Sequence, residues 1–145
     1  MLTEVTPPAA QSQLNTTILI IEDDTNIGKF LQQLIEEKTP YRTAIINNSQ
    51  TALEQAQYIQ PCLMLVDYYL PEINGLDLYD RLQHVEGIRG TPAIMMSATL
   101  PTQELEQRGI YQLRKPTDIG GVIRMITHAL LMFERQQLYD QHHQP

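Results

Sequence analysis

Short apolar runs alternate with segments of helical periodicity along this chain, and this alternation restricts the possible folds more than any other feature. Most of the runs are continuously apolar, which is typical of parallel strands buried on both faces. The runs are Ile18 to Ile21, Thr43 to Ile46, Leu63 to Val66, Ala93 to Met96 and Tyr111 to Arg114. Five successive strand–helix units predict an α/β fold, with a doubly wound five-stranded parallel sheet and helices on both faces.

Helix signals separate these runs. The candidate N-caps are Asp24 or Thr25, Asn48 or Ser49, and Thr117 or Asp118. The first helix is expected to bury one stripe, made of Ile27, Phe30, Leu31, Leu34 and Ile35. A short helix is expected from Thr102 to Arg108, ended by Gly109, and the last helix is expected to run to about Tyr139.

Length and charge bound the organisation of the chain. Its 145 residues, of which 42% are hydrophobic, fit one globular domain with a sizeable core. We expect a flexible N-terminal leader over residues 1–15, the domain over 16–140 and a disordered tail over 141–145. The formal net charge of -7 argues against direct contact with nucleic acid or an anionic membrane. Without a signal peptide or a membrane-spanning run, the expected location is the cytoplasm.

Four of the apolar runs end in residues that can carry chemistry. These residues are Glu22 and Asp23 after the first run, Asp67 after the third, Ser97 after the fourth and Lys115 after the fifth. In open parallel sheets, ligands bind beyond the carboxyl ends of the strands, near the switch in strand order. We therefore expect carboxylates, a hydroxyl and an amine to gather at one edge of the sheet.

This set of residue types suits phosphoryl transfer. Three carboxylates close together repel one another, and a hard divalent cation such as Mg²⁺ relieves that repulsion. Asp67 would attack phosphorus in line and form an acyl phosphate. Lys115 would supply a positive charge opposite the metal, and Ser97 would donate a hydrogen bond to a phosphoryl oxygen.

The motifs resemble those of the receiver domain of bacterial two-component response regulators, including the chemotaxis regulators. The resemblance covers about residues 17 to 135 and rests on Ile18 to Asp24, Leu65 to Gly75, Ser97-Ala98 and Lys115-Pro116, in this order and near the usual spacing. Each motif alone is weak, but the four together are specific. The resemblance implies a flavodoxin-like fold with strand order 2-1-3-4-5.

The resemblance also implies a role for each site residue. Asp67 would accept a phosphoryl group from a histidine kinase or a histidine phosphotransfer protein. Glu22, Asp23 and Asp67 would hold Mg²⁺, with the backbone carbonyl of Tyr69 as a further ligand. Ser97 and Lys115 would contact the phosphoryl group.

The chain departs from the family pattern at three places, of which the first two concern the output. Gln112 stands three residues before Lys115, where the family usually has Tyr or Phe. Tyr111 is one place earlier and would point to the other side of the strand. The stretch from Ser97 to Lys115 is shorter than usual, which predicts a clipped fourth helix. Tyr69 lies two residues after the phosphoacceptor, where smaller or polar residues often stand.

The resulting hypothesis is a phosphorylation-controlled signalling switch, not a metabolic enzyme, that assists only its own phosphorylation and dephosphorylation. Its output would pass through a protein partner or a missing output domain, and it can form a homodimer through the face of the short helix, the fifth strand and the last helix. One alternative is a pseudo-receiver that binds partners without phosphorylation. Another is a Mg²⁺-dependent aspartyl phosphatase, which would need a second Asp at the position of Tyr69.

Overall fold

The computed structural model describes residues 16–115 and 118–143. The expected N-terminal leader, the candidate cap Thr117 and the last two residues of the expected tail lie outside these described residues.

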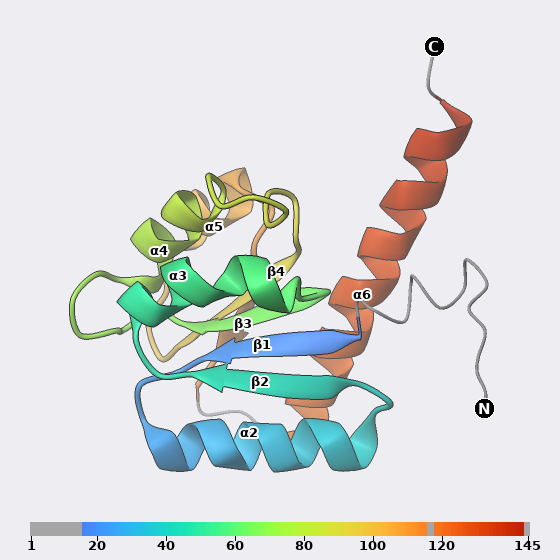
Figure 1. The fold of residues 1–145 in the computed structure, drawn as a ribbon. Coiled ribbons are helices and arrows are strands. Elements are labelled where there is room, and N and C mark those ends of the chain that lie inside the picture. The colour runs from blue at the N-terminus through green and yellow to red at the C-terminus, as the bar shows by residue number, and fades with distance from the viewer. Residues whose placement is uncertain (1–15, 116–117, 144–145) are drawn as a thin grey trace, which may run out of the picture.

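The described residues form a parallel sheet of five strands in the order β2-β1-β3-β4-β5, as predicted. The strands are β1 (Thr17–Ile21), β2 (Arg42–Ile46), β3 (Leu63–Asp67), β4 (Ala93–Ser97) and β5 (Tyr111–Arg114). The helices are α2 (Thr25–Lys38), α3 (Ser49–Ile59), α4 (Gly75–Leu82), α5 (Thr102–Gln107) and α6 (Ile119–His142). Figure 1 shows the sheet with helices on both sides, which is a flavodoxin-like arrangement.

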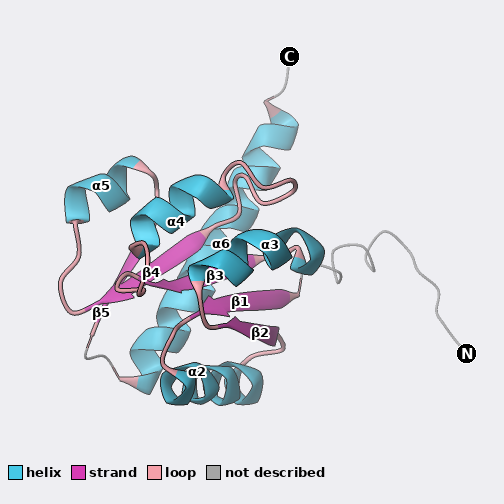
Figure 2. Cartoon of the chain, turned by 60° about the vertical axis from the view of Figure 1, so that its left-hand side comes forward, coloured by secondary structure: helices cyan, strands magenta, loops and turns pink. Residues whose placement is uncertain are grey.

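Two apolar clusters hold the helices against the sheet. On one face, α3, α4 and α5 contribute Ala52, Ala56, Leu76, Leu78, Leu82 and Leu105 to the first cluster. On the other face, α2 and α6 contribute Leu31, Leu34, Ile35, Val122, Ile126 and Ala129 to the second. Figure 2 shows this division from a second direction. Because both faces are covered, the apolar runs of the central strands β1, β3 and β4 are fully buried.

Side-chain caps start four of the helices, and Asn74 caps α4 by accepting a hydrogen bond from the Asp77 amide. Asp24 accepts hydrogen bonds from the backbone of Asn26 and Ile27, and Asn48 accepts one from Thr51. Asp118 caps α6 by accepting a hydrogen bond from the Gly121 amide. Asp24, Asn48 and Asp118 each belong to a predicted pair of candidates, and all four caps satisfy backbone donors that have no partner within the helix.

The expected stripe on α2 was wrong at two positions. Phe30 and Ile27 are 53% and 36% exposed, whereas Leu31, Leu34 and Ile35 are buried as expected. The buried face is centred on Gly28, Leu31 and Ile35, so that Phe30 falls at its edge and Ile27 lies in the first turn. At Gly28 an added Cβ would lie only 3.2 Å from Ile45, so the helix approaches β2 closely there.

The last two helices differ in length. The predicted short helix is present as α5, with six residues. In contrast, α6 has 24 residues and continues to His142, beyond the expected end at Tyr139 and into the expected tail. Its carboxyl-terminal part projects past the start of β1 (Figure 1). Despite its length, neither α6 nor any other helix among the described residues has an apolar stretch long enough to cross a membrane.

Candidate functional site

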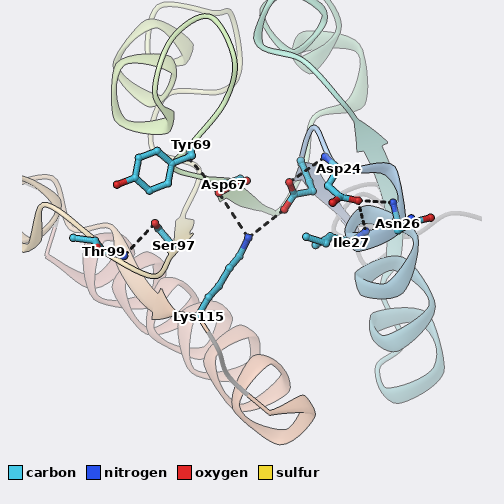
Figure 3. Close-up of polar contacts among 9 residues, drawn as sticks. Asp24, Asn26, Ile27, Asp67, Tyr69, Ser97, Thr99 and Lys115 are labelled. Carbon is cyan, nitrogen blue, oxygen red and sulfur yellow. Dashed lines mark hydrogen bonds and ion pairs between the residues drawn. The ribbon is translucent and has the colours of Figure 1, made fainter.

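The carboxyl edge of the sheet collects the residues that sequence analysis selected. Asp67 and Ser97 are the last residues of β3 and β4, and Glu22 and Lys115 directly follow β1 and β5. The strand register aligns these ends, since Ile21 pairs with Val66 and Asp67 pairs with Met96. Figure 3 shows Asp67, Ser97 and Lys115 around one space at this edge.

Gly75 brings the start of α4 against the backbone of Asp67. Its amide donates a hydrogen bond of 2.7 Å to the carbonyl of Tyr68. An added Cβ would lie 2.6 Å from the Asp67 carbonyl oxygen and 2.6 Å from the sulfur of Met95. Only glycine therefore fits here without a shift, and the loop between Asp67 and α4 depends on it.

An acidic cluster surrounds Asp67. Glu22, Asp23 and Asp67 each offer a carboxylate oxygen, and these three atoms lie within 4.8 Å of one another. Glu22 and Asp67 are only 1% and 7% exposed, whereas Asp23 is exposed. The cluster therefore has two buried members and one that faces solvent.

Glu22 has an unusual environment for a carboxylate. Burial, together with a hydrogen bond and charge repulsion from Asp67, raises its pKa from 4.5 to about 7. The backbone amide of Asp24 and the charge of Lys115 act in the opposite direction. The Asp24 amide donates to Oε2 at 3.2 Å. Among the described residues, Oε1 has no hydrogen-bond partner, although the Lys115 ammonium lies 3.5 Å away.

These groups fit a hard divalent cation. A buried carboxylate oxygen without a hydrogen bond is costly, and a metal ion would satisfy it. Carboxylate oxygens are the ligands that Mg²⁺ prefers, and the exposed Asp23 leaves room for the waters that Mg²⁺ retains. The residues present are therefore suited to a metal site beside Asp67.

Lys115 and Ser97 approach Asp67 from the β4–β5 side. The Lys115 ammonium is 3.8 Å from Asp67 Oδ1, and its backbone amide donates to the Ser97 carbonyl at 2.9 Å. The Ser97 hydroxyl is buried and accepts a hydrogen bond of 3.3 Å from the Thr99 amide. Both residues therefore stand at the carboxyl edge of the sheet, as the sequence predicted, and the Lys115 ammonium reaches across to Glu22 as well as to Asp67.

Tyr69 contributes its backbone rather than its ring. Its amide donates a hydrogen bond of 3.3 Å to Asp67 Oδ1. Its ring is 61% exposed and packs edge-on against the ring of Tyr68, with centroids 5.0 Å apart. The role of the Tyr69 carbonyl as a metal ligand stays a prediction.

The side chains of β5 alternate as the sequence predicted. Tyr111 packs in the cluster beneath α2 and α6, and its ring meets that of His128 edge-on at 5.6 Å. Gln112 and Arg114 therefore belong to the α5 side of the strand. Arg114 donates to the Thr102 hydroxyl at 3.2 Å, a contact that sequence analysis missed. The alternation of side chains along β5 could have indicated the face of the strand on which Arg114 lies. Nothing in the local sequence indicated that its partner is Thr102.

Comparison with known proteins gives a consistent result. Residues 18–127 match the family described as response regulator receiver domain. Response regulator ArlR of Staphylococcus saprophyticus is 29% identical over 129 residues, which cover 86% of this chain and 57% of that protein. The polar-differentiation response regulator DivK of Brucella anthropi is 33% identical over 82 residues, which cover 57% of this chain and 66% of that protein. The chain thus spans only part of these relatives.

Solved structures show the same fold. A CheY-like receiver domain protein from Methanospirillum hungatei superposes with a TM-score of 0.75 at 22% identity, over 83% of this chain and 98% of the other. The chemotaxis protein CheY4 of Vibrio cholerae gives a TM-score of 0.72 at 19% identity, over 79% of this chain and 98% of the other.

Proposed function

Since this chain belongs to the response regulator receiver domain family of two-component systems, we propose that it is a phosphorylation-controlled signalling switch with Asp67 as the phosphoacceptor. The observation that carries this proposal is the setting of Asp67. It is 7% exposed, has two carboxylates within 4.8 Å on one side and has an ammonium 3.8 Å away. A lone capping Asp has no need of such neighbours.

Each neighbour of Asp67 has a separate part in the proposed transfer. An Asp67 oxygen forms the new bond to phosphorus while the bond to the donor's histidine nitrogen breaks, and the electron pair leaves with that nitrogen. Glu22 and Asp23 would hold Mg²⁺ together with Asp67, and the ion would supply positive charge for the phosphoryl oxygens. Lys115 neutralises charge on the phosphoryl oxygens from the opposite side, and the Ser97 hydroxyl donates a hydrogen bond to a phosphoryl oxygen.

The partners of this switch follow from its chemistry. The donor would be a histidine kinase or a histidine phosphotransfer protein in the cytoplasm. The phosphoryl group would bias two pre-existing conformations, which a downstream protein or an output domain then distinguishes. The face of α5, β5 and α6 would carry the change and can pair with a second copy. We propose no direct contact with nucleic acid, given the net charge of -7.

Intact-mass measurement tests the proposal. With acetyl phosphate and Mg²⁺, the wild-type protein should gain the mass of one phosphoryl group, and Asp67→Asn should gain none. Asp77→Asn changes an exposed carboxylate on α4 and should behave as wild type. A wild-type protein that stays unmodified would contradict phosphorylation and favour the binding-module alternative. Modification that persists in Asp67→Asn would move the site elsewhere.

A further inference from the structure

Two adjacent basic residues at the end of β5 reach toward different parts of the molecule. The Lys115 ammonium lies 3.5 Å from Glu22 and 3.8 Å from Asp67. The Arg114 guanidinium donates to the Ala98 carbonyl at 3.5 Å and to the Thr102 hydroxyl at 3.2 Å. Lys115 therefore contacts the acidic cluster, and its neighbour Arg114 contacts the connection between β4 and α5.

We infer that Arg114 is the positioning residue that couples the state of Asp67 to α5, in place of the aromatic side chain that Gln112 does not supply. The inference rests on the proposed function, because it concerns how phosphorylation at Asp67 is transmitted.

The backbone around Ser97 links the two events. Ser97 pairs with Arg114 in the sheet register, and its carbonyl accepts from the Lys115 amide at 2.9 Å. The Ser97 hydroxyl accepts a hydrogen bond from the Thr99 amide at 3.3 Å. Because a hydroxyl can accept and donate at once, Ser97 can keep this bond while it donates to a phosphoryl oxygen. Movement of the hydroxyl toward the phosphoryl group would then pull the Thr99 amide and the loop that contains Ala98, and with it one acceptor of Arg114.

The construction of α5 makes its first turn sensitive to this contact. Pro101 precedes the helix and offers no side-chain cap, and Leu105 is the only buried residue of the six in α5. The other end of α5 is fixed, since Arg108 makes a forked ion pair with Asp80 of α4, at 2.8 and 2.9 Å. The helix is therefore held firmly at its carboxyl end and by Arg114 at its amino end, an arrangement that allows it to pivot.

The strength of the Arg114 contact suits a switch. A single hydrogen bond shifts an equilibrium by only about threefold to tenfold, which phosphorylation can readily outweigh. A contact of this size stabilises one position of α5 without preventing the other. The Arg108–Asp80 pair, with two short and parallel bonds, is the more durable of the two attachments.

Hydrogen–deuterium exchange of residues 98–107 tests the inference in Arg114→Ala, with Arg114→Lys and Arg124→Ala as comparisons. Without ligand, Arg114→Ala should exchange about threefold to tenfold faster at the α5 amides that bond back to the first turn, such as that of Leu105, which donates to the Pro101 carbonyl. With Mg²⁺ and beryllofluoride, the change that the wild-type protein shows in this segment should be lost. Arg114→Lys should be intermediate, since an ammonium cannot bridge both acceptors. Arg124, an exposed arginine of α6, should be replaceable without effect.

The outcomes separate this inference from the proposed function. If Arg114→Ala exchanges faster but responds to beryllofluoride as fully as wild type, Arg114 is merely structural and the inference is overturned. Unchanged exchange in both states overturns it as well. Intact mass after acetyl phosphate treatment, measured on the same samples, should show Arg114→Ala phosphorylated like wild type. A wild-type protein without phosphorylation would instead refute the proposed function, and the inference with it.

Discussion

At the scale of single residues, Glu22 is the most buried charged side chain among the described residues. It is 1% exposed and adjoins two other carboxylates, yet Lys115 and the Asp24 amide are its main compensating neighbours. Such a carboxyl costs stability when ionised, unless a cation is bound. The acidic cluster therefore lowers the stability of the ligand-free fold, and the proposed cation would offset that cost.

Stability without metal should depend on the charge of Glu22. Its pKa is 4.5 when unperturbed and about 7 in the fold, so between these values the folded state binds more protons than the unfolded state. This contribution is present below pH 4.5 and is lost as pH rises to about 7. At pH 8, in a chelator, Glu22→Gln should raise the free energy of unfolding by about 1–3 kcal/mol. Urea denaturation across this pH range measures it.

The exposed Glu86→Gln is the matched control for that series and should retain the pH dependence of wild type. Parallel pH profiles for wild type and Glu22→Gln would show that Glu22 is ionised at little cost, contrary to its burial.

Asp23 should contribute to metal binding without contributing to folding, since it is the exposed member of the cluster. Mg²⁺ at ten times its dissociation constant should stabilise the wild-type protein by about 1.4 kcal/mol. Asp23→Asn should fold normally and lose most of this gain. Thermal unfolding with Mg²⁺ and with chelator measures both quantities. An equal gain from Mg²⁺ in wild type and Asp23→Asn would place the ion elsewhere.

Among the elements, the β3–α4 connection carries the tightest backbone approach to the site. Gly75→Ala would place a Cβ 2.6 Å from the Asp67 carbonyl oxygen, so α4 or the loop must shift. We expect a loss of about 1–3 kcal/mol in the free energy of unfolding, together with slower phosphorylation of Asp67. Urea denaturation and intact-mass time courses measure the two effects.

Gly120→Ala is the control for this substitution. An added Cβ there would lie 2.8 Å from the flexible end of Arg124 and at an ordinary contact distance of 3.7 Å from the Asp118 carboxylate. Alanine also favours a helix over glycine, so we expect no loss of stability. Comparable destabilisation by both changes would mean that the close approach at Gly75 is not special.

The sheet was predictable from the sequence because a continuous apolar run has few interpretations in an α/β pattern. For example, Leu63 to Val66 is buried on both faces, as its composition indicates. The α2 stripe was less predictable, because the rotation of a helix depends on its partner. The close packing of Gly28 on Ile45 decided that rotation and left Phe30 outside.

The site was predictable to the extent that it depends on topology. Asp67, Ser97 and Lys115 each end or follow a strand, so parallel order alone brings them to one edge. The hydrogen-bond deficit of Glu22 Oε1 and the reach of Arg114 to Thr102 depend on side-chain conformations and on the loop after β4. Those details arise from contacts between distant segments, which a local pattern does not encode.

For the whole molecule, the proposed pairing of two copies concerns the face of α5, β5 and α6. Leu131 of α6 is 46% exposed, an apolar side chain without cover among the described residues. Sedimentation should show a larger mass with Mg²⁺ and beryllofluoride than without. Leu131→Gln should weaken this pairing about tenfold, since it removes an apolar contact that the pairing of two copies would bury.

Tyr58→Gln is the control, because Tyr58 is 76% exposed on α3, across the sheet from α6. A monomer in both conditions would count against self-association through this face, and equal weakening by Tyr58→Gln would place the interface on the α3 side.

Because α6 is long, a small tilt at its first turn moves its far end by a larger distance. One continuous helix of 24 residues begins at Ile119, near the carboxyl edge of the sheet where Lys115 lies, and ends past the opposite edge. Such a rod is about 36 Å long. A tilt of about 5° at its first turn would carry its far end through roughly 3 Å at that length. A partner protein bound to the far end of α6 would therefore detect an amplified displacement without contacting the acidic cluster.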